Sequence, residues 1–218
     1  MFILSLLNQP LHILVFYVIA MIIAITLHEL AHAVWSDRLG DPTPRNFGRI
    51  SLNPLRHLDP VGTLMFFLAG IIWASTPTNP SYYRIGARKG SAQVALAGPL
   101  TNFALALVAA LPFRVGILTM PISGSAPVQF LSEFLLVFVG FNLLLTVFNL
   151  IPIPPLDGFT VLLGLLPEQQ ARSLTPLYQY GPMLLLFLFM ADSFTPINIF
   201  GAIIGPPRDF LSDVLLGG

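Results

Sequence analysis

The sequence contains no cysteine and very few charged residues. The absence of Cys among its 218 residues excludes disulfides and thiolate metal ligands, so any metal site must use His, Asp or Glu. Charged residues make up only 9% of the chain, whereas soluble domains carry roughly 25%. Together with 55% hydrophobic residues and a mean hydropathy of +0.81, this composition indicates an integral membrane protein.

The chain also lacks an excess of charge of either sign. Ten basic residues balance ten acidic ones, which removes any reason to expect nucleic acid as a partner. A membrane span needs about 20 residues, so we expect an all-α polytopic membrane protein with four to six membrane segments. We expect residues 1–218 to form a single membrane-embedded domain, with no room for a separate soluble domain.

Long apolar runs mark the predicted membrane segments. Three runs are long enough to cross a bilayer with confidence: residues 11–35, 92–113 and 128–151. A further run, residues 177–191, is marginal in length. We expect residues 208–216 to form a short amphipathic helix at the interface.

The region between the first two spans is predicted to be irregular. Residues 48–53, GRISLN, alternate in polarity and predict a short strand. Residues 61–76 are apolar but short for a span, and basic loops flank them on both sides. A re-entrant segment would keep both loops on the cytoplasmic side, in agreement with the positive-inside rule. We therefore predict a re-entrant hairpin or shallow helix there.

The distribution of Lys and Arg predicts the orientation in the membrane. Residues 34–91 contain seven of them and residues 114–127 contain one. The first span should therefore run from outside to inside, and its C-terminal half should lie nearer the cytoplasm.

That half contains the sequence HELAH, residues 28–32. His28 and His32 are one helical turn apart on the same face, so both imidazoles can bind a single metal ion. Glu29 can contact a water on that ion and take its proton. The alternative is a pair of polar histidines that pack between helices. Ionisable groups inside a span are costly, which favours a functional site, roughly 10 Å below one surface.

A catalytic zinc ion commonly has three protein ligands. His12 lies at the opposite end of the first span, and Glu133 lies near the outer end of its own span, so neither can complete the site. Asp157 follows a Pro-rich turn at the depth of the two histidines, although an Asp-Gly pair can equally be an ordinary turn or helix cap. The candidates that stay open beside it are the loop residues Asp37, Asp41, His57 and Asp59.

The motifs resemble those of the site-2 protease family of membrane-embedded zinc metalloproteases. The matching segments are HELAH, LAGPLTN at residues 96–102 and FNLIPIPPLDG at residues 148–158. Residues 48–65 and 73–80 also resemble the stretch between motifs in the compact prokaryotic members of the family. The resemblance covers roughly residues 20–165, and it implies a multi-pass protein of a prokaryotic plasma membrane that cleaves transmembrane protein substrates.

The resemblance also implies a role for individual residues. It makes His28, His32 and Asp157 the ligands of a single Zn²⁺ ion and Glu29 the catalytic base. Asn149 matches an Asn that lies close to the site and that would orient substrate or stabilise the oxyanion. Asn102 matches the Asn after the Gly-Pro pair, where a helix-packing amide is an equally good interpretation, and we do not expect His57 to be a ligand.

Two other classes of function compete with a protease. A membrane transporter can also carry intramembrane His and acidic residues, but it predicts inverted repeats, and the sequence shows none. A metal-binding scaffold for client helices would be favoured by the loss of Glu29 or of a ligand, and all of these residues are present. The sequence predicts no oligomeric state.

Overall fold

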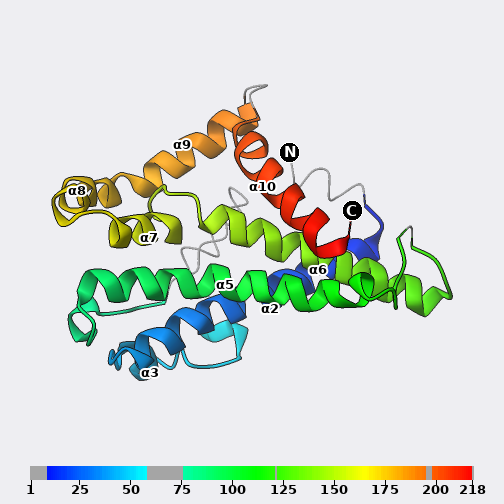
Figure 1. The fold of residues 1–218 in the computed structure, drawn as a ribbon, viewed down its shortest axis with the longest axis horizontal. Helices are drawn as coiled ribbons and strands as arrows, with labels where there is room; N and C mark the ends of the chain where they lie inside the picture. Colours follow the sequence, from blue (N-terminus) through cyan, green and yellow to red (C-terminus); the bar gives the residue numbers. More distant parts are fainter. Residues whose placement is uncertain (1–8, 58–75, 121, 195–197, 218) are drawn as a thin grey trace.

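Three long helices lie side by side and form the body of the protein (Figure 1). They are α2 (Leu11–Arg38), α5 (Ala87–Arg114) and α6 (Ala126–Asn149), and each is long and apolar enough to cross a membrane. The computed structural model describes residues 9–57, 76–120, 122–194 and 198–217. The remaining elements in these ranges are α3 (Thr43–Asn46), η1 (Pro54–Arg56), η2 (Pro80–Tyr82), α7 (Asp157–Leu165), α8 (Glu168–Leu174), η3 (Thr175–Gln179), α9 (Gly181–Phe194) and α10 (Ile199–Leu216).

The all-α, multi-pass architecture expected from the sequence is confirmed. A fourth span is present if residues 168–179 and residues 181–192, which meet at a bend of 65°, are counted as one. This bent pair covers the marginal run at 177–191. The predicted re-entrant segment at 61–76 lies outside the described residues except for Thr76.

Helix α2 is continuous because its 28 residues contain neither Gly nor Pro. It ends where Gly40 adopts a φ of 110°, a conformation that only glycine takes readily. The N–H of Gly40 donates to the carbonyl of Asp37, and the N–H of Asp41 donates to the carbonyl of Ser36. These two bonds form a Schellman motif, which satisfies the last carbonyls of the helix.

Small side chains bring α2 and α5 close together. The hydrophobic core that α2 and α5 share with α6 contains five buried alanines of these two helices, namely Ala20, Ala24, Ala106, Ala109 and Ala110. In a membrane, where lipid is as apolar as Leu, close packing of small residues is a main source of helix association. The alanines therefore let polar side chains of α2 and α5 reach one another.

One prediction about local structure is wrong, and another is too short. Residues 48–53 do not form a strand, and no strand occurs among the described residues. Their alternation lacks a partner strand, and bends followed by the Pro-initiated η1 take its place. Residues 208–216 are helical as predicted, but they do not form a separate short helix. They continue α10, which runs through Pro206 and Pro207 and packs its residue Leu215 into the core of α5 and α6.

Candidate metal centre

The HELAH residues lie on the buried face of α2. His28, Glu29 and His32 are 7%, 5% and 8% exposed. The two histidines are one turn apart, and their Nε2 atoms face each other at 3.0 Å. One possible ligand atom from each of the three residues lies within 4.8 Å of the others, so the cluster is compact enough to hold a metal ion.

Asp157 joins this cluster from another part of the chain. It is the first residue of α7 and follows the irregular turn at residues 150–156. Its Oδ2 atom lies 3.2 Å from Nε2 of His28 and 3.4 Å from Nε2 of His32. The turn folds tightly back on α7, since a Cβ atom at Gly158 would stand 2.2 Å from the carbonyl oxygen of Leu150. The Asp-Gly pair thus brings the carboxylate to the histidines.

The other nitrogen of each imidazole contacts α5. Nδ1 of His32 lies 2.7 Å from the carbonyl oxygen of Val94, and Nδ1 of His28 lies 2.6 Å from Oδ1 of Asn102. Both partners are oxygen atoms that accept hydrogen bonds, so both Nδ1 atoms carry the hydrogen. The Nε2 atoms are then left with lone pairs directed at Asp157.

This donor set fits a zinc ion. Two imidazole lone pairs and a carboxylate oxygen converge at 3.0–3.4 Å, and Oδ2 of Asp157 is buried with no hydrogen-bond partner among the described residues. Ligand atoms about 2.0–2.2 Å from a tetrahedral zinc ion stand about 3.3 Å apart. A cation bound between the three atoms would compensate their mutual repulsion.

A glycine of α5 makes room for the cluster. A Cβ atom at Gly98 would stand 2.5 Å from Nε2 of His28 and 2.5 Å from Nε2 of His32. Any other residue would therefore push against both candidate ligands. Gly98 belongs to the LAGPLTN motif but was not among the predicted site residues.

Glu29 is held by Thr76, which was not among the predicted site residues either. The hydroxyl of Thr76 donates to Oε2 of Glu29 at 2.7 Å and lies 3.1 Å from the carbonyl oxygen of Glu29. This contact joins α2 to the segment that leads into η2. A carboxylate fixed in this way, one residue from the candidate ligand His28, is suited to accept a proton from a water molecule.

The remaining candidates lie elsewhere. Asn149 ends α6, and its amide donates to the carbonyl of Leu145 in the same helix at 3.0 Å, so its predicted role toward substrate stays a prediction. His57 is buried, and its Nε2 atom contacts the carbonyl oxygen of Ser51. His12 pairs with Glu133 at 3.1 Å near the first turns of α2 and α6.

The loop carboxylates that had stayed open as ligands are engaged in other contacts. Asp37 forms an ion pair with Arg45, and both of its oxygens accept hydrogen bonds from that side chain. Asp41 accepts hydrogen bonds from Ser36 and from the backbone of Thr43 and Asn79. Asp59 lies outside the described residues. Of the carboxylates considered for the third ligand, the structure brings Asp157 to the histidines.

Known proteins that resemble this chain are also zinc metalloproteases by name. Residues 112–190 match peptidase family M50. Relatives that carry the name "Putative zinc metalloprotease" include YwhC of Bacillus subtilis, which is 35% identical over 84% of this chain and 84% of its own length. They also include Rip2 of Mycobacterium tuberculosis, 33% identical over 79% of this chain, and Rip2 of Mycolicibacterium smegmatis, 31% identical over 79%.

The chain spans 65% of the length of either Rip2 protein. No solved structure matches the chain at a significant level. The match to YwhC covers most of both chains. The cluster of His, Glu and Asp side chains between α2 and α7 is of the kind that a zinc metalloprotease requires. The chain therefore belongs to peptidase family M50, the site-2 protease family of zinc metalloproteases.

Proposed function

We propose that this zinc metalloprotease is an intramembrane endopeptidase that hydrolyses peptide bonds in membrane-spanning segments of protein substrates. The observation that carries the proposal is the position of the donor set. Three donor atoms meet beside α2, which is long and apolar enough to span a bilayer. They are Nε2 of His28, Nε2 of His32 and Oδ2 of Asp157. His28 is ten residues before the end of α2 at Arg38, or about 15 Å along the helix axis.

His28, His32 and Asp157 would hold one zinc ion, and Glu29 would act as the base. The ion held there would supply a water that is nucleophilic near neutral pH and would polarise the carbonyl of the scissile bond. Glu29 takes the proton of the attacking water and transfers it to the leaving amine. The hydroxyl of Thr76, 2.7 Å from Oε2, keeps the carboxylate oriented for both transfers.

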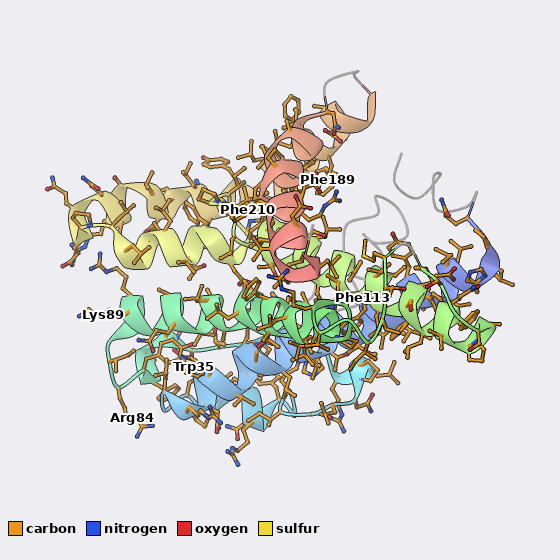
Figure 2. All side chains as sticks on the ribbon, turned by 45° about the vertical axis from the view of Figure 1, so that its right-hand side comes forward. Trp35, Arg84, Lys89, Phe113, Phe189 and Phe210 are labelled. Carbon is orange, nitrogen blue, oxygen red and sulfur yellow. The ribbon has the colours of Figure 1, made fainter. Side chains whose placement is uncertain are left out.

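The charged residues support a site nearer the cytoplasmic face. Figure 2 shows Arg84 and Lys89 at the end of the bundle where Trp35 lies, whereas Phe113 lies toward the other end. Trp35 is three residues after His32 on α2. Since basic residues favour the cytoplasmic side, the HELAH end of α2 faces the cytoplasm in this proposal.

The test is cleavage of a membrane-spanning substrate by the purified, detergent-solubilised full chain, with mass spectrometry to locate the cut. We expect wild-type protein to cleave within the apolar segment, and Glu29→Gln to retain zinc but lose activity by at least about 100-fold. Glu133→Gln is the matched control, because Glu133 also sits in a long apolar helix but pairs with His12 at 3.1 Å. Equal cleavage by Glu29→Gln would refute the proposal.

A further inference from the structure

We propose that Asn142 of α6 positions the metal ligand His28 through Asn102 of α5. The inference rests on the proposed zinc site. It adds Asn142, a residue of the third long helix whose side chain bonds to Asn102 and Phe138. Asn142 would act as a positioning residue, because its effect on the metal passes through a second side chain.

A chain of hydrogen bonds connects the two residues. The Nδ2 atom of Asn142 donates to the carbonyl of Phe138 at 2.9 Å, and its Oδ1 atom accepts from Nδ2 of Asn102 at 3.0 Å. Nδ2 of Asn102 also donates to the carbonyl of Ala24 at 3.2 Å. Oδ1 of Asn102 then lies 2.6 Å from Nδ1 of His28.

The backbone carbonyls determine the direction of every bond in this chain. A carbonyl oxygen can only accept, so the amide atom next to Phe138 must be the nitrogen of Asn142, and the atom next to Ala24 must be the nitrogen of Asn102. Oδ1 of Asn102 is thereby turned toward His28. Since this oxygen also only accepts, Nδ1 of His28 carries the hydrogen and Nε2 presents its lone pair to the metal.

Burial prevents water from replacing these bonds. Asn102 and Asn142 are both 0% exposed, and His28 is 7% exposed. An amide that loses its partner here stays unsatisfied, which is costly away from water. If Asn142 were apolar, Nδ2 of Asn102 would keep Ala24 alone as acceptor, and the amide would be less firmly held toward His28.

The other histidine does not depend on this chain. Nδ1 of His32 contacts the carbonyl oxygen of Val94, which belongs to the backbone of α5. A change at Asn142 should therefore weaken metal binding without removing it.

The test is the zinc dissociation constant of the purified full chain, measured by competition with a chromophoric chelator. Loss of an outer partner of a metal-bound His typically weakens metal binding about 10- to 100-fold. We expect such a loss for Asn102→Leu and about a 10-fold loss for Asn142→Leu. In the double variant we expect no loss beyond that of Asn102→Leu, because both changes interrupt the same chain.

The matched control is Ser132→Ala. Ser132 is also buried in α6 and its hydroxyl donates to the carbonyl of Val128 in the same helix, without contact to the chain of amides. Its zinc affinity should equal that of the wild type. Wild-type affinity in Asn142→Leu, or losses that multiply in the double variant, would overturn the inference.

A conservative variant covers the case in which Asn142→Leu does not fold. A protonated Asp at position 142 can accept from Asn102 and donate to Phe138, so Asn142→Asp should bind zinc as the wild type does. A 10-fold weaker affinity of this variant would also contradict the inference. His32→Ala separates the two proposals: if it keeps full zinc affinity, the zinc site itself is refuted, whereas loss in His32→Ala beside wild-type affinity in Asn142→Leu refutes only the role of Asn142.

Discussion

At the scale of single residues, the candidate site depends on a glycine, Gly98, which has no side chain. A Cβ atom at Gly98 would lie too close to the Nε2 atoms of His28 and His32. The two imidazoles can face Asp157 from α2 only because α5 presents bare backbone at this point. Gly98 is therefore as necessary to this geometry as the candidate ligands themselves.

We predict that Gly98→Ala weakens zinc binding. The methyl group would force both imidazoles away from Asp157, and zinc affinity should fall by at least about 10-fold. Gly140→Ala is the matched control, since Gly140 also lies in a long apolar helix and a Cβ atom there meets nothing within 4 Å. Zinc content per chain, measured by mass spectrometry of the metal, checks both variants. Full zinc content in Gly98→Ala would contradict the predicted crowding.

A second prediction concerns Thr76. Thr76→Val removes the hydroxyl that donates to Oε2 of Glu29 but keeps the shape of the side chain. A hydrogen bond to a charged group contributes about 1.5–3 kcal/mol, so we expect kcat to fall about 10-fold or more while zinc content stays unchanged. Thr76→Ser keeps the hydroxyl and should retain most of the activity. If Thr76→Val shows wild-type kcat, Glu29 does not depend on this contact.

Some of these residues could be predicted from the sequence, and others could not, for a physical reason. The four-residue spacing of His28 and His32 places both on one helix face, so the pair could be predicted from local geometry. The choice of third ligand could be reduced to a few residues, but Asp157 could not be distinguished from loop residues such as Asp41. Gly98 and Thr76 act through contacts between elements far apart in the chain, and no local pattern encodes such a contact.

At the scale of elements, the end of α2 anchors the loops beside the site. Asp41 is the last residue of the Schellman motif and is 0% exposed. Its Oδ2 atom accepts from Ser36 and from the N–H of Asn79, and Oδ1 accepts from the N–H of Thr43. Asn79 is three residues after Thr76. Asp41 thus connects the end of α2 to the segment that holds Glu29.

This anchor predicts a dependence of stability on pH. Burial alone would raise the pKa of Asp41, but hydrogen bonds from Thr43, Asn79 and Ser36 outweigh it and lower the pKa below the ordinary value of 3.8. The stabilisation is complete above that ordinary pKa, and it is lost as the pH falls through the lowered pKa of the folded state. Asp41→Asn should therefore lower the free energy of unfolding at pH 7 by about 1–3 kcal/mol, and this variant should lose less additional stability on acidification.

Thermal unfolding of both proteins between pH 7 and about pH 3 checks this prediction. Asp192→Asn serves as a control, because the carboxylate of Asp192 accepts from the N–H of Phe200 near the other end of the chain. Parallel curves for Asp41→Asn and the wild type would show that Asp41 does not cause the acid sensitivity.

The long helices could be predicted from the sequence, and the short elements could not. The expected span 11–35 lies within α2, and 92–113 lies within α5, because a long apolar run in a membrane can satisfy its backbone only as a helix. The alternation at residues 48–53 was too short to predict a strand correctly. Helix α10 begins at Ile199, nine residues before the predicted helix 208–216, and it continues through Pro206 and Pro207 while it packs on α5 and α6.

At the scale of the whole molecule, the two ends of the bundle differ in charge. Arg84 and Lys89 lie at the end that carries the HELAH motif (Figure 2), and the pair of His12 and Glu133 lies near the starts of α2 and α6. The proposed orientation places the basic end in the cytoplasm.

The absence of cysteine makes this orientation testable. A single Cys can be placed at exposed Lys89 or at exposed Ser123, the latter in the connection between α5 and α6. In intact bacterial cells we expect a membrane-impermeant maleimide to label Ser123→Cys, and to label Lys89→Cys only after the cells are opened. The reverse pattern would place the candidate site nearer the outer face.

The measurement that tests the account most directly is the zinc content of purified Asp157→Ala beside that of the wild type. The central claim is that Asp157 completes a zinc site with His28 and His32, since its Oδ2 atom lies 3.2 Å and 3.4 Å from their Nε2 atoms. We predict about one zinc ion per wild-type chain, a similar content in the control His57→Ala, and loss of most of the zinc in Asp157→Ala after dialysis against a chelator. A folded Asp157→Ala protein that keeps its full zinc content would contradict the account.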